Sequence, residues 1–256
     1  MSTMEAQGVN EVPITQRIEC ENCPLNDIPH LRPLEDSQRS LISTLKTGEM
    51  TAPAGATVLV EGSGNAYLFS ILSGWGFRYK TLDDGRRQIL NYVFPGDVIG
   101  LQGSLMDEMQ HSIEALSPLV LCVFQKTDLP KLFSNLPQLA YDLTWLTARE
   151  EIMLDEHLLS VGQRSALERT AYLIAFLHQR ARAARMLEGQ KSIPVTQQHL
   201  ADTLGLSIVH TNKTLRRLAI LKALRWEKGG CTVLDETILL HISGWEGLPA
   251  LKRPYI

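Results

Sequence analysis

Apolar and polar positions alternate with two different periods along this 256-residue chain. Between about Gly48 and Lys126, short apolar runs are separated by turns rich in Gly and Asp. This spacing predicts the strands of a compact β-barrel or roll, and Asp84-Gly85 between two runs is a hairpin signal. The best strand candidates are Thr57–Val60, Tyr67–Leu72, Gly76–Lys80, Arg87–Phe94 and Leu119–Phe124. A short amphipathic helix is predicted ahead of them, from Asp36 to Lys46.

After Thr127 the apolar period becomes helical. One stripe steps by three and four residues, through Leu136, Leu139, Leu143, Leu146, Glu150, Met153, His157 and Ser160. This spacing is that of a coiled-coil seam, so it predicts a long helix over residues 135–161 that pairs with its copy in a dimer. A single amphipathic helix packed on the roll would give a similar pattern, and the stripe alone leaves both arrangements open.

Two short helices joined by a tight turn are predicted within residues 195–218. Thr196 can cap the first helix, Gly205 can end it with a positive φ, and Ser207 can cap the second. One face of the second helix is apolar, and the other carries His210, Lys213, Arg216 and Arg217. A tight glycine turn followed by a basic helix predicts a helix-turn-helix that reads DNA. The alternative is an ordinary helical hairpin with a solvated basic face.

The regions around this motif complete a four-part organisation. A helix from about Ser165 to Arg185 precedes it, and Arg180, Arg182 and Arg185 on that helix face either solvent or phosphate. Two short strands with a Gly turn follow it, Leu224–Glu227 and Cys231–Leu234, and predict a small wing. We therefore expect an α+β chain with a flexible tail (1–17), a β-roll sensor (18–134), a dimerisation helix (135–161) and a winged helix-turn-helix (162–256).

The distribution of charge supports this division. Residues 162–228 hold 12 Lys and Arg against 4 Asp and Glu, a local balance of +8, which leaves −11 for the rest of a chain of net charge −3. A basic region of this kind suits a partner with phosphate groups. No apolar run approaches the roughly 18 residues of a membrane span, and the first residues lack a secretory pattern, so we expect a cytoplasmic protein without membrane contact. The chain shows no catalytic motif, and we expect no enzymatic activity.

The order of these elements resembles that of the Crp/Fnr family of bacterial transcription regulators. Two motifs carry the resemblance: residues 94–100 (FPGDVIG) in the roll and residues 196–207 (TQQHLADTLGLS) in the helix-turn-helix. The resemblance implies a cyclic-nucleotide-binding-like β-roll, a long dimerisation helix and a winged helix-turn-helix. It further implies a homodimer that binds a palindromic site in double-stranded promoter DNA and acts on RNA polymerase, as an activator in the family's best-known cases.

The sequence departs from the cyclic-nucleotide branch of the family. That branch has Gly-Glu-Leu after the Gly-Asp turn, and Arg-Ser about ten residues later. The matching residues here are Gly100-Leu101-Gln102 and His111-Ser112. Gln102 cannot replace a carboxylate at equal strength, and a neutral His111 supplies no permanent charge for a cyclic phosphate. We therefore expect no binding of cyclic AMP of the usual kind.

The oxygen-sensing branch binds a 4Fe-4S cluster through three N-terminal cysteines and one in the roll. Cys20, Cys23 and Cys122 fall where three of these four ligands would lie. Either His30 or a substrate-like or solvent ligand would take the place of the missing one. The resemblance thus implies an iron-sulfur site and oxygen or redox sensing. Two alternatives remain, a thiol-based redox switch and a plain arrangement in which Cys20 and Cys23 are a surface pair and Cys122 is a buried strand residue.

The expected DNA contacts also differ from those of the familiar branches. Val209 stands at the usual Glu position of the second helix and can touch only a thymine methyl, whereas Lys213 can reach guanine and Asn212 can read adenine. The full set of expected DNA-binding residues is Thr196, Gln197, Ser207, Val209, His210, Asn212, Lys213, Arg216 and Arg217. The rival hypothesis is a ligand-sensing interaction module whose helix-turn-helix binds protein instead of DNA.

Overall fold

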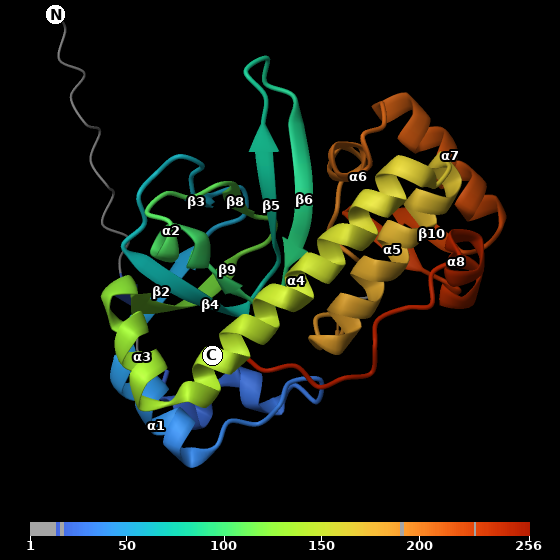
Figure 1. The fold of residues 1–256 in the computed structure, drawn as a ribbon. Coiled ribbons are helices and arrows are strands. Elements are labelled where there is room, and N and C mark those ends of the chain that lie inside the picture. The colour runs from blue at the N-terminus through green and yellow to red at the C-terminus, as the bar shows by residue number, and fades with distance from the viewer. Residues whose placement is uncertain (1–13, 16–17, 190–191, 228) are drawn as a thin grey trace, which may run out of the picture.

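The computed structural model describes residues 14–15, 18–189, 192–227 and 229–256. A β-roll, a long helix and a smaller helical domain follow one another along the chain, as Figure 1 shows. The predicted α+β class is thereby confirmed.

Two antiparallel sheets form the roll. The order across the first is Ile14–Thr15 (β1), Lys46–Ala52 (β2), Leu119–Gln125 (β9), Tyr67–Ser73 (β4) and Val98–Ile99 (β7). The order across the second is Thr57–Leu59 (β3), Ser112–Ala115 (β8), Gly76–Thr81 (β5) and Arg87–Val93 (β6). Side chains such as Ile71, Phe77 and Leu121 are fully buried in the roll. Strands β4 and β9 are buried on both faces, because successive side chains pack into two different apolar clusters.

The five predicted strands are confirmed as β3, β4, β5, β6 and β9, within one residue at each end. The longest strand that the pattern missed is β2, which carries a buried ion pair between Lys46 and Glu49. Two charged side chains at buried positions break the apolar alternation on which strand prediction depends. The expected flexible tail is wrong at Ile14–Thr15, which pairs with Glu49 and Met50 of β2; the rest of residues 1–17 lies outside the described part.

Short helices pack around the roll. They are Cys20–Asn22 (η1), Pro24–Asp27 (η2), Asp36–Leu45 (α1), Leu101–Leu105 (α2), Lys126–Asp128 (η3) and Leu129–Asn135 (α3). Leu25, Ile42 and Leu129 from this group pack in one apolar cluster with Leu68 and Phe124 of the first sheet. The N-terminal segment is therefore part of the sensor's core.

The long helix α4 (Pro137–Gln163) packs along the roll and then against the helical domain (Figure 1). The stripe predicted to form a dimer seam faces inward: Leu139 and Leu143 are buried in the N-terminal apolar cluster, and Met153 is buried between the two domains. His157 and Ser160 are buried as well. The seam prediction is wrong for these residues, and the alternative of an amphipathic helix packed on its own chain is correct. Both arrangements require the same period, so periodicity alone could not separate them.

The C-terminal helical domain is built around α5 (Ala166–Ala183). The remaining elements are α6 (Gln197–Leu204), α7 (Ile208–Ile220), β10 (Leu224–Glu227), β11 (Gly230–Val233) and α8 (Glu236–Ser243). Strands β10 and β11 pair as the predicted wing, whereas α8 was not predicted. After α8 the chain turns back and crosses to the roll (Figure 1). No helix in the described part of the chain is long and apolar enough to span a bilayer.

Candidate DNA-binding interface and sensor face

Local capping sets the geometry of the helix-turn-helix. The Thr196 hydroxyl accepts from the His199 amide at 3.1 Å, and the His199 ring accepts from the Thr196 amide at 3.2 Å. Gly205 ends α6 with φ 62°, a left-handed backbone that glycine adopts at low cost. Ser207 then caps α7 by accepting from the amide of His210 at 3.3 Å. All three local predictions thus match the structure.

Helix α7 has two distinct faces. Thr211, Leu215 and Leu218 are buried against the domain core. On the other face Val209 is 75% exposed, and His210, Lys213, Arg216 and Arg217 are exposed as well. Among the described residues, Lys213, Arg216 and Arg217 form no ion pair with the protein. The exposed face is therefore free to bind an external anion or base edge.

Asn212 differs from the other expected contacts. It is half-buried, and its amide donates to the side-chain oxygen of Gln197 at 2.6 Å. This hydrogen bond joins the start of α6 to the first turns of α7. In this structure Asn212 and Gln197 therefore fix the angle between the two helices, and the predicted contact of Asn212 with adenine would require this bond to open.

Arg180 and Arg182 of α5, and Arg185 just beyond the end of this helix, have partners within the chain. Arg180 is buried and pairs with Asp97 of the roll at 2.6 Å, Arg182 pairs with Glu236 at 3.1 Å, and the Arg185 side chain donates to the Asp27 carbonyl at 2.9 Å. A phosphate-facing role for Arg180 is excluded by this burial. The basic balance of the region therefore overstates the charge that can meet DNA.

Helix α6 is docked on the β5–β6 hairpin of the roll. Arg87 of β6 pairs with Asp202 of α6 at 3.0 Å and with Glu114 of β8 at 3.2 Å. The buried hydroxyls of Tyr92 and Thr203 lie 2.9 Å apart. The sensor thus holds the first helix of the motif directly.

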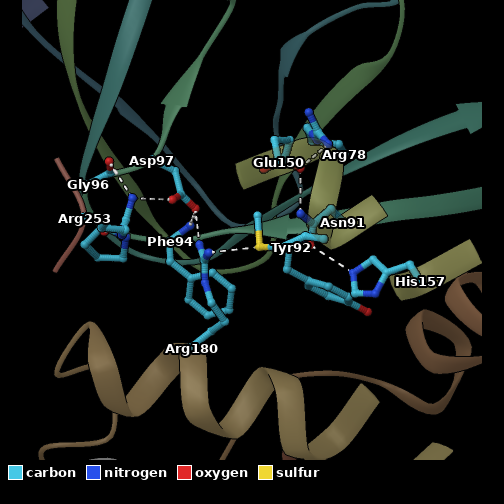
Figure 2. Close-up of polar contacts among 12 residues, drawn as sticks. Arg78, Asn91, Tyr92, Phe94, Gly96, Asp97, Glu150, His157, Arg180 and Arg253 are labelled. Carbon is cyan, nitrogen blue, oxygen red and sulfur yellow. Dashed lines mark hydrogen bonds and ion pairs between the residues drawn. The ribbon is translucent and has the colours of Figure 1, made fainter. Parts of the chain in front are cut away.

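A second contact runs through α4, as Figure 2 shows. The ring nitrogen Nε2 of His157 lies 3.2 Å from the Asn91 side-chain oxygen, and Nδ1 lies 2.6 Å from the Tyr172 hydroxyl. Burial first, then the charges of Arg78 and Arg180, lowers the pKa of His157 to about 4. A neutral imidazole that donates from Nε2 and accepts at Nδ1 satisfies both partners. The His157 ring therefore joins the roll to α5.

The roll and α4 enclose a cavity of about 450 Å³, whose lining includes Arg78, Gln102, His111 and Arg149. Arg78 pairs with Glu150 of α4. Burial and the charges of Arg78 and Lys80 lower the pKa of His111 to about 4, so this ring is neutral near pH 7. Both residues that replace the family's ligand-binding pair thus face this cavity, and neither carries a charge.

Three cysteines lie in the N-terminal apolar cluster of the sensor. Cys122 is buried in β9, and Cys20 and Cys23 are half-buried against the same apolar cluster. Burial raises the pKa of Cys23 and raises that of Cys122 to about 12, which keeps both as thiols. His30 lies elsewhere, at a small cavity lined by Arg149, Arg180 and Arg253.

In the part of the chain that the structure describes, no three His, Cys, Asp or Glu side chains are arranged to hold a metal ion. The resemblance implied four ligands, and the chain brings at most three cysteines to one cluster and leaves His30 away from them. These residues therefore do not fit a four-ligand cluster.

Three interactions of this interface were not predicted. The first is the contact of Asp97 with Arg180 and Arg253, and the second is the docking of α6 on the hairpin. The third feature not predicted is an exposed apolar face on α4, where Ile152 is 68% exposed. Asp97 lies in a motif singled out from the sequence, but no local signal marks Arg253, since its partners are more than 150 residues away.

Comparisons with known proteins agree with this architecture. A cyclic nucleotide-binding domain model matches residues 49–135, and a Crp-like helix-turn-helix domain model matches residues 168–242. The nitrogen fixation regulation protein FixK of Bradyrhizobium diazoefficiens is 30% identical over 182 residues, which cover 71% of this chain and 76% of that protein. The transcriptional activator protein FnrL of Cereibacter sphaeroides is 24% identical over 214 residues, 82% of this chain and 85% of the relative.

Among solved structures, that of FixK2 from Bradyrhizobium japonicum is similar in fold, with a TM-score of 0.66 and 23% identity. The match covers 77% of this chain and 96% of the FixK2 chain. The similarity therefore extends over both the roll and the helix-turn-helix.

Proposed function

Since this chain belongs to the Crp/Fnr family of DNA-binding transcription regulators, we propose that it works as a homodimer in which two α7 helices read an inverted repeat. The observation that carries the proposal is the exposed, unpaired basic face of α7. A helix placed this way by a helix-turn-helix enters the major groove, and a two-fold dimer spaces two such helices about one DNA turn (~34 Å) apart. We keep the predicted division into sensor, long helix and DNA-binding domain at residues 18–134, 135–161 and 162–256.

The outward face of α4 is the surface that we assign to the dimer. Large apolar side chains are exposed along it: Tyr141 is 62% exposed, Ile152 68%, Leu158 73% and Leu159 50%. Tyr141, Trp145, Ala148, Ile152 and Leu159 step by four, three, four and seven residues, which is coiled-coil spacing. An exposed apolar stripe of this kind on one helix marks an interaction surface. The dimer proposal therefore stays, but with a different stripe from the one predicted.

Each exposed residue of the motif has an expected contact. Lys213 suits guanine acceptors, Val209 a thymine methyl and His210 a base edge or phosphate. Thr196, Gln197 and Ser207 lie at the starts of the two helices, where hydroxyls and amides commonly contact the DNA backbone. Arg216 and Arg217 farther along α7 would bind phosphates, and Asn212 would act by holding Gln197.

For the signal, the sensor's residues favour neither of the family's best-known ligands. The cavity between the roll and α4 offers the uncharged side chains of Gln102 and His111, which do not suit cyclic AMP binding of the usual kind. The N-terminal apolar cluster offers three thiols without a fourth protein ligand, which does not suit an iron-sulfur cluster. Among the sensor's thiols, Cys20 and Cys23 are half-exposed, so they are the ones accessible to an oxidant, and the raised pKa of Cys23 slows the reaction at that residue.

The remaining parts of the proposal rest on the relatives. Several, such as FnrL, are named transcriptional activators, and we propose activation through RNA polymerase for this chain as well. We further propose that it acts in the cytoplasm, where chromosomal DNA lies in bacteria, and that it has no enzymatic activity.

The experiment combines binding with assembly. Gel shifts and footprinting on promoter fragments should show a protected site whose affinity falls steeply with salt, because several phosphate contacts release counterions. Sedimentation should give a dimer that Ile152→Glu dissociates, with Glu151→Gln as a control at the neighbouring position. If the protein bound DNA only without sequence preference, the proposal of sequence-specific DNA binding would be contradicted. The rival hypothesis, a helix-turn-helix that binds protein, would then be favoured. A dimer unaffected by Ile152→Glu would contradict the α4 interface.

A separate assay tests the signal. Anaerobic purification followed by an absorbance spectrum and iron and sulfide assays should give a colourless protein with free thiols. Stoichiometric iron and sulfide with broad visible absorption would contradict the thiol proposal.

A further inference from the structure

The last twelve residues described, 245–256, form a segment that joins the two ends of the molecule; we call it the return segment. Helix α8 ends at Gly244, which adopts φ 62° and turns the chain. The return segment then runs from the DNA-binding domain across to the N-terminal part of the sensor, as the red trace in Figure 1 shows. It has no helix or strand of its own, so its position depends on the contacts described next.

At the DNA-binding domain the return segment is held by α5. The Trp245 ring packs edge-on against Tyr172 with 5.2 Å between ring centroids, and lies 6.2 Å from that of Phe176. The Leu248 amide donates to the side-chain oxygen of Gln179 at 2.7 Å. These contacts attach the start of the segment to the helix that supports the helix-turn-helix.

In the middle, Arg253 is buried and meets the turn between β6 and β7. Its guanidinium donates to the carbonyls of Pro95 at 2.7 Å and Gly96 at 3.0 Å, and it pairs with Asp97 Oδ1 at 2.9 Å. The other oxygen of the same carboxylate pairs with Arg180 of α5 at 2.6 Å. Figure 2 shows Asp97 between the two arginines. One sensor carboxylate therefore holds both the DNA-binding domain and the return segment.

The buried charges of Asp97, Arg180 and Arg253 depend on one another, so this contact is sensitive to the loss of any of the three side chains. Burial alone would raise the pKa of Asp97, but the charges of Arg180 and Arg253, and then Arg149, outweigh it and lower the pKa. Burial lowers the pKa of Arg253 to about 10, against the attraction of Asp97. Backbone groups contribute as well, since Arg253 donates to two carbonyls and Asp97 accepts from the Phe94 amide. The opposite charges are nevertheless each other's ion-pair partners, so removing one leaves a buried charge without its counter-charge.

At its far end the return segment covers the cysteine side of the sensor. The Arg253 amide donates to the His30 carbonyl at 3.0 Å, and the Arg32 amide donates to the Arg253 carbonyl at 2.8 Å. The Tyr255 hydroxyl donates to the Asn26 side-chain oxygen at 2.7 Å, and the side-chain nitrogen Nδ2 of Asn26 donates to the Cys20 carbonyl at 3.2 Å.

The side chains at this end are buried as well. Tyr255 and Ile256 are buried in the apolar cluster that holds Cys122 and is packed against Cys20 and Cys23. One continuous chain of contacts therefore leads from the cysteines to α5.

We propose that the return segment is an intramolecular strap that couples the N-terminal cysteine segment (residues 18–33) to the DNA-binding domain, with Arg253 and Asp97 as positioning residues. A change that loosens the cysteine segment releases Tyr255 and Arg253, frees Asp97 from one partner and lets α5 move relative to the roll. By linkage, a change at α5 must alter the cysteine segment by the same coupling free energy. The coupling within the protein does not depend on DNA binding, whereas its use in regulation rests on the proposed function.

The test perturbs one end and measures the other. Purified full-length protein is alkylated with N-ethylmaleimide, and the modification rate of the peptide that contains Cys20 and Cys23 is measured by mass spectrometry. Arg253→Ala should raise this rate at least about fivefold, the lower end of typical coupling. Gln179→Ala, which removes only the Leu248 contact on α5, should raise it by a smaller but measurable factor. Lys252→Ala removes the same charge from the exposed neighbouring position and should leave the rate unchanged.

Two controls separate coupling from damage to the fold. Circular dichroism and a cooperative thermal transition show whether each variant is folded, and Tyr255→Phe removes a single hydroxyl should Arg253→Ala fail to fold; it should also raise the alkylation rate. Equal rates in Arg253→Ala (or its substitute Tyr255→Phe) and Lys252→Ala would overturn the strap. A faster rate in Arg253→Ala with no change in Gln179→Ala would show that the segment is anchored to the sensor alone, and would overturn the coupling.

A second arm reads the effect on DNA. Alkylated and unmodified protein are titrated onto a duplex that carries the footprinted site, and their affinities should differ severalfold in the wild type but not in Arg253→Ala. Failure of both proteins to bind DNA contradicts the proposed function and leaves the alkylation result valid. Equal affinities with intact DNA binding would overturn the regulatory use of the strap.

Discussion

The reading helix α7 and the cysteine segment 18–33 are opposite kinds of candidate site. On α7 the functional side chains point outward, and Lys213, Arg216 and Arg217 have no ion-pair partner among the described residues. In the cysteine segment, the chemically reactive groups are turned inward or half-covered, and Tyr255 and Ile256 lie over them. The first is built to meet a partner outside the protein, and the second to affect other parts of the same chain.

This difference decides where each site can be tested. Loss of an exposed side chain on α7 should weaken DNA binding and leave the fold intact, because nothing inside the protein depends on it. Loss of a buried contact between the sensor and the DNA-binding domain should instead change the stability of the protein or the reactivity of its cysteines, because each partner in such a contact is buried.

The largest effect is expected at the junction between the roll and α5, from the titration of His157. Its folded-state pKa of about 4 lies below the ordinary value of 6.5, so the unfolded chain binds the proton first as the pH falls. The stability contributed by the neutral ring is complete above about pH 6.5 and is lost between 6.5 and 4, by about 3 kcal/mol for this group. The groups that face the ring are Asn91, Tyr172, Arg78 and Arg180.

Chemical denaturation at several pH values in this window checks the result. His157→Gln can still donate and accept hydrogen bonds but does not titrate, so its stability should fall less with pH than that of the wild type. Since other groups, including His111, titrate equally in both proteins, the difference isolates His157. Parallel pH profiles would show that the junction does not depend on this proton.

The next effect is expected on the reading face. Lys213→Ala should weaken binding to the specific site by about 1–3 kcal/mol and leave binding to unrelated DNA nearly unchanged, because a base contact is lost. Fluorescence anisotropy on both duplexes measures this, with Lys252→Ala as the charge-matched control outside the motif. An equal loss on both duplexes would assign Lys213 to phosphate instead of a base.

Arg216 and Arg217 should show that opposite pattern. Alanine at either position should weaken all sequences alike and reduce the slope of log affinity against log salt by about 0.9 per phosphate contact. Salt titrations of the single and double variants measure the slope. An unchanged slope in the double variant would place these two residues away from the DNA backbone.

The smallest effect is expected at the cap that begins α6. Thr196→Ala removes the acceptor for the His199 amide and should lower stability by about 1 kcal/mol, whereas Thr196→Ser keeps it. Thermal unfolding of the two variants compares them directly. If Ser and Ala were equally destabilising, the cap would not be what positions α6.

The same contrast explains how much the sequence could predict. Thr196, Gly205 and Ser207 act within a few residues of themselves, so the helix-turn-helix and the exposed face of α7 followed from the sequence. Strand β2 did not, since the burial of Lys46 and Glu49 depends on their ion pair, which no alternation pattern shows. The family resemblance supplied the order of the domains and the cysteine positions.

Long-range contacts set the limit of sequence prediction. The stripe from Leu139 to His157 has the spacing of a dimer seam, but the same spacing serves a helix packed on its own roll, and only the structure shows which stripe is buried. Arg180 adds to the basic charge of the DNA-binding region in the sequence, but in the structure it pairs with Asp97 of the roll. His30 lies near the cysteines in sequence and near three arginines in space. In each case the partner that decides the role is distant in the chain.

The central claim is that two copies of α7 read DNA in two-fold symmetry, and selection of bound duplexes from a random library tests it most directly. The enriched sequences should form an inverted repeat whose half-site centres lie about 10 base pairs apart. The same selection with Lys213→Ala should lose the preference at one position of each half-site. A library that yields no enriched sequence, or a single half-site without its inverted copy, would contradict the claim.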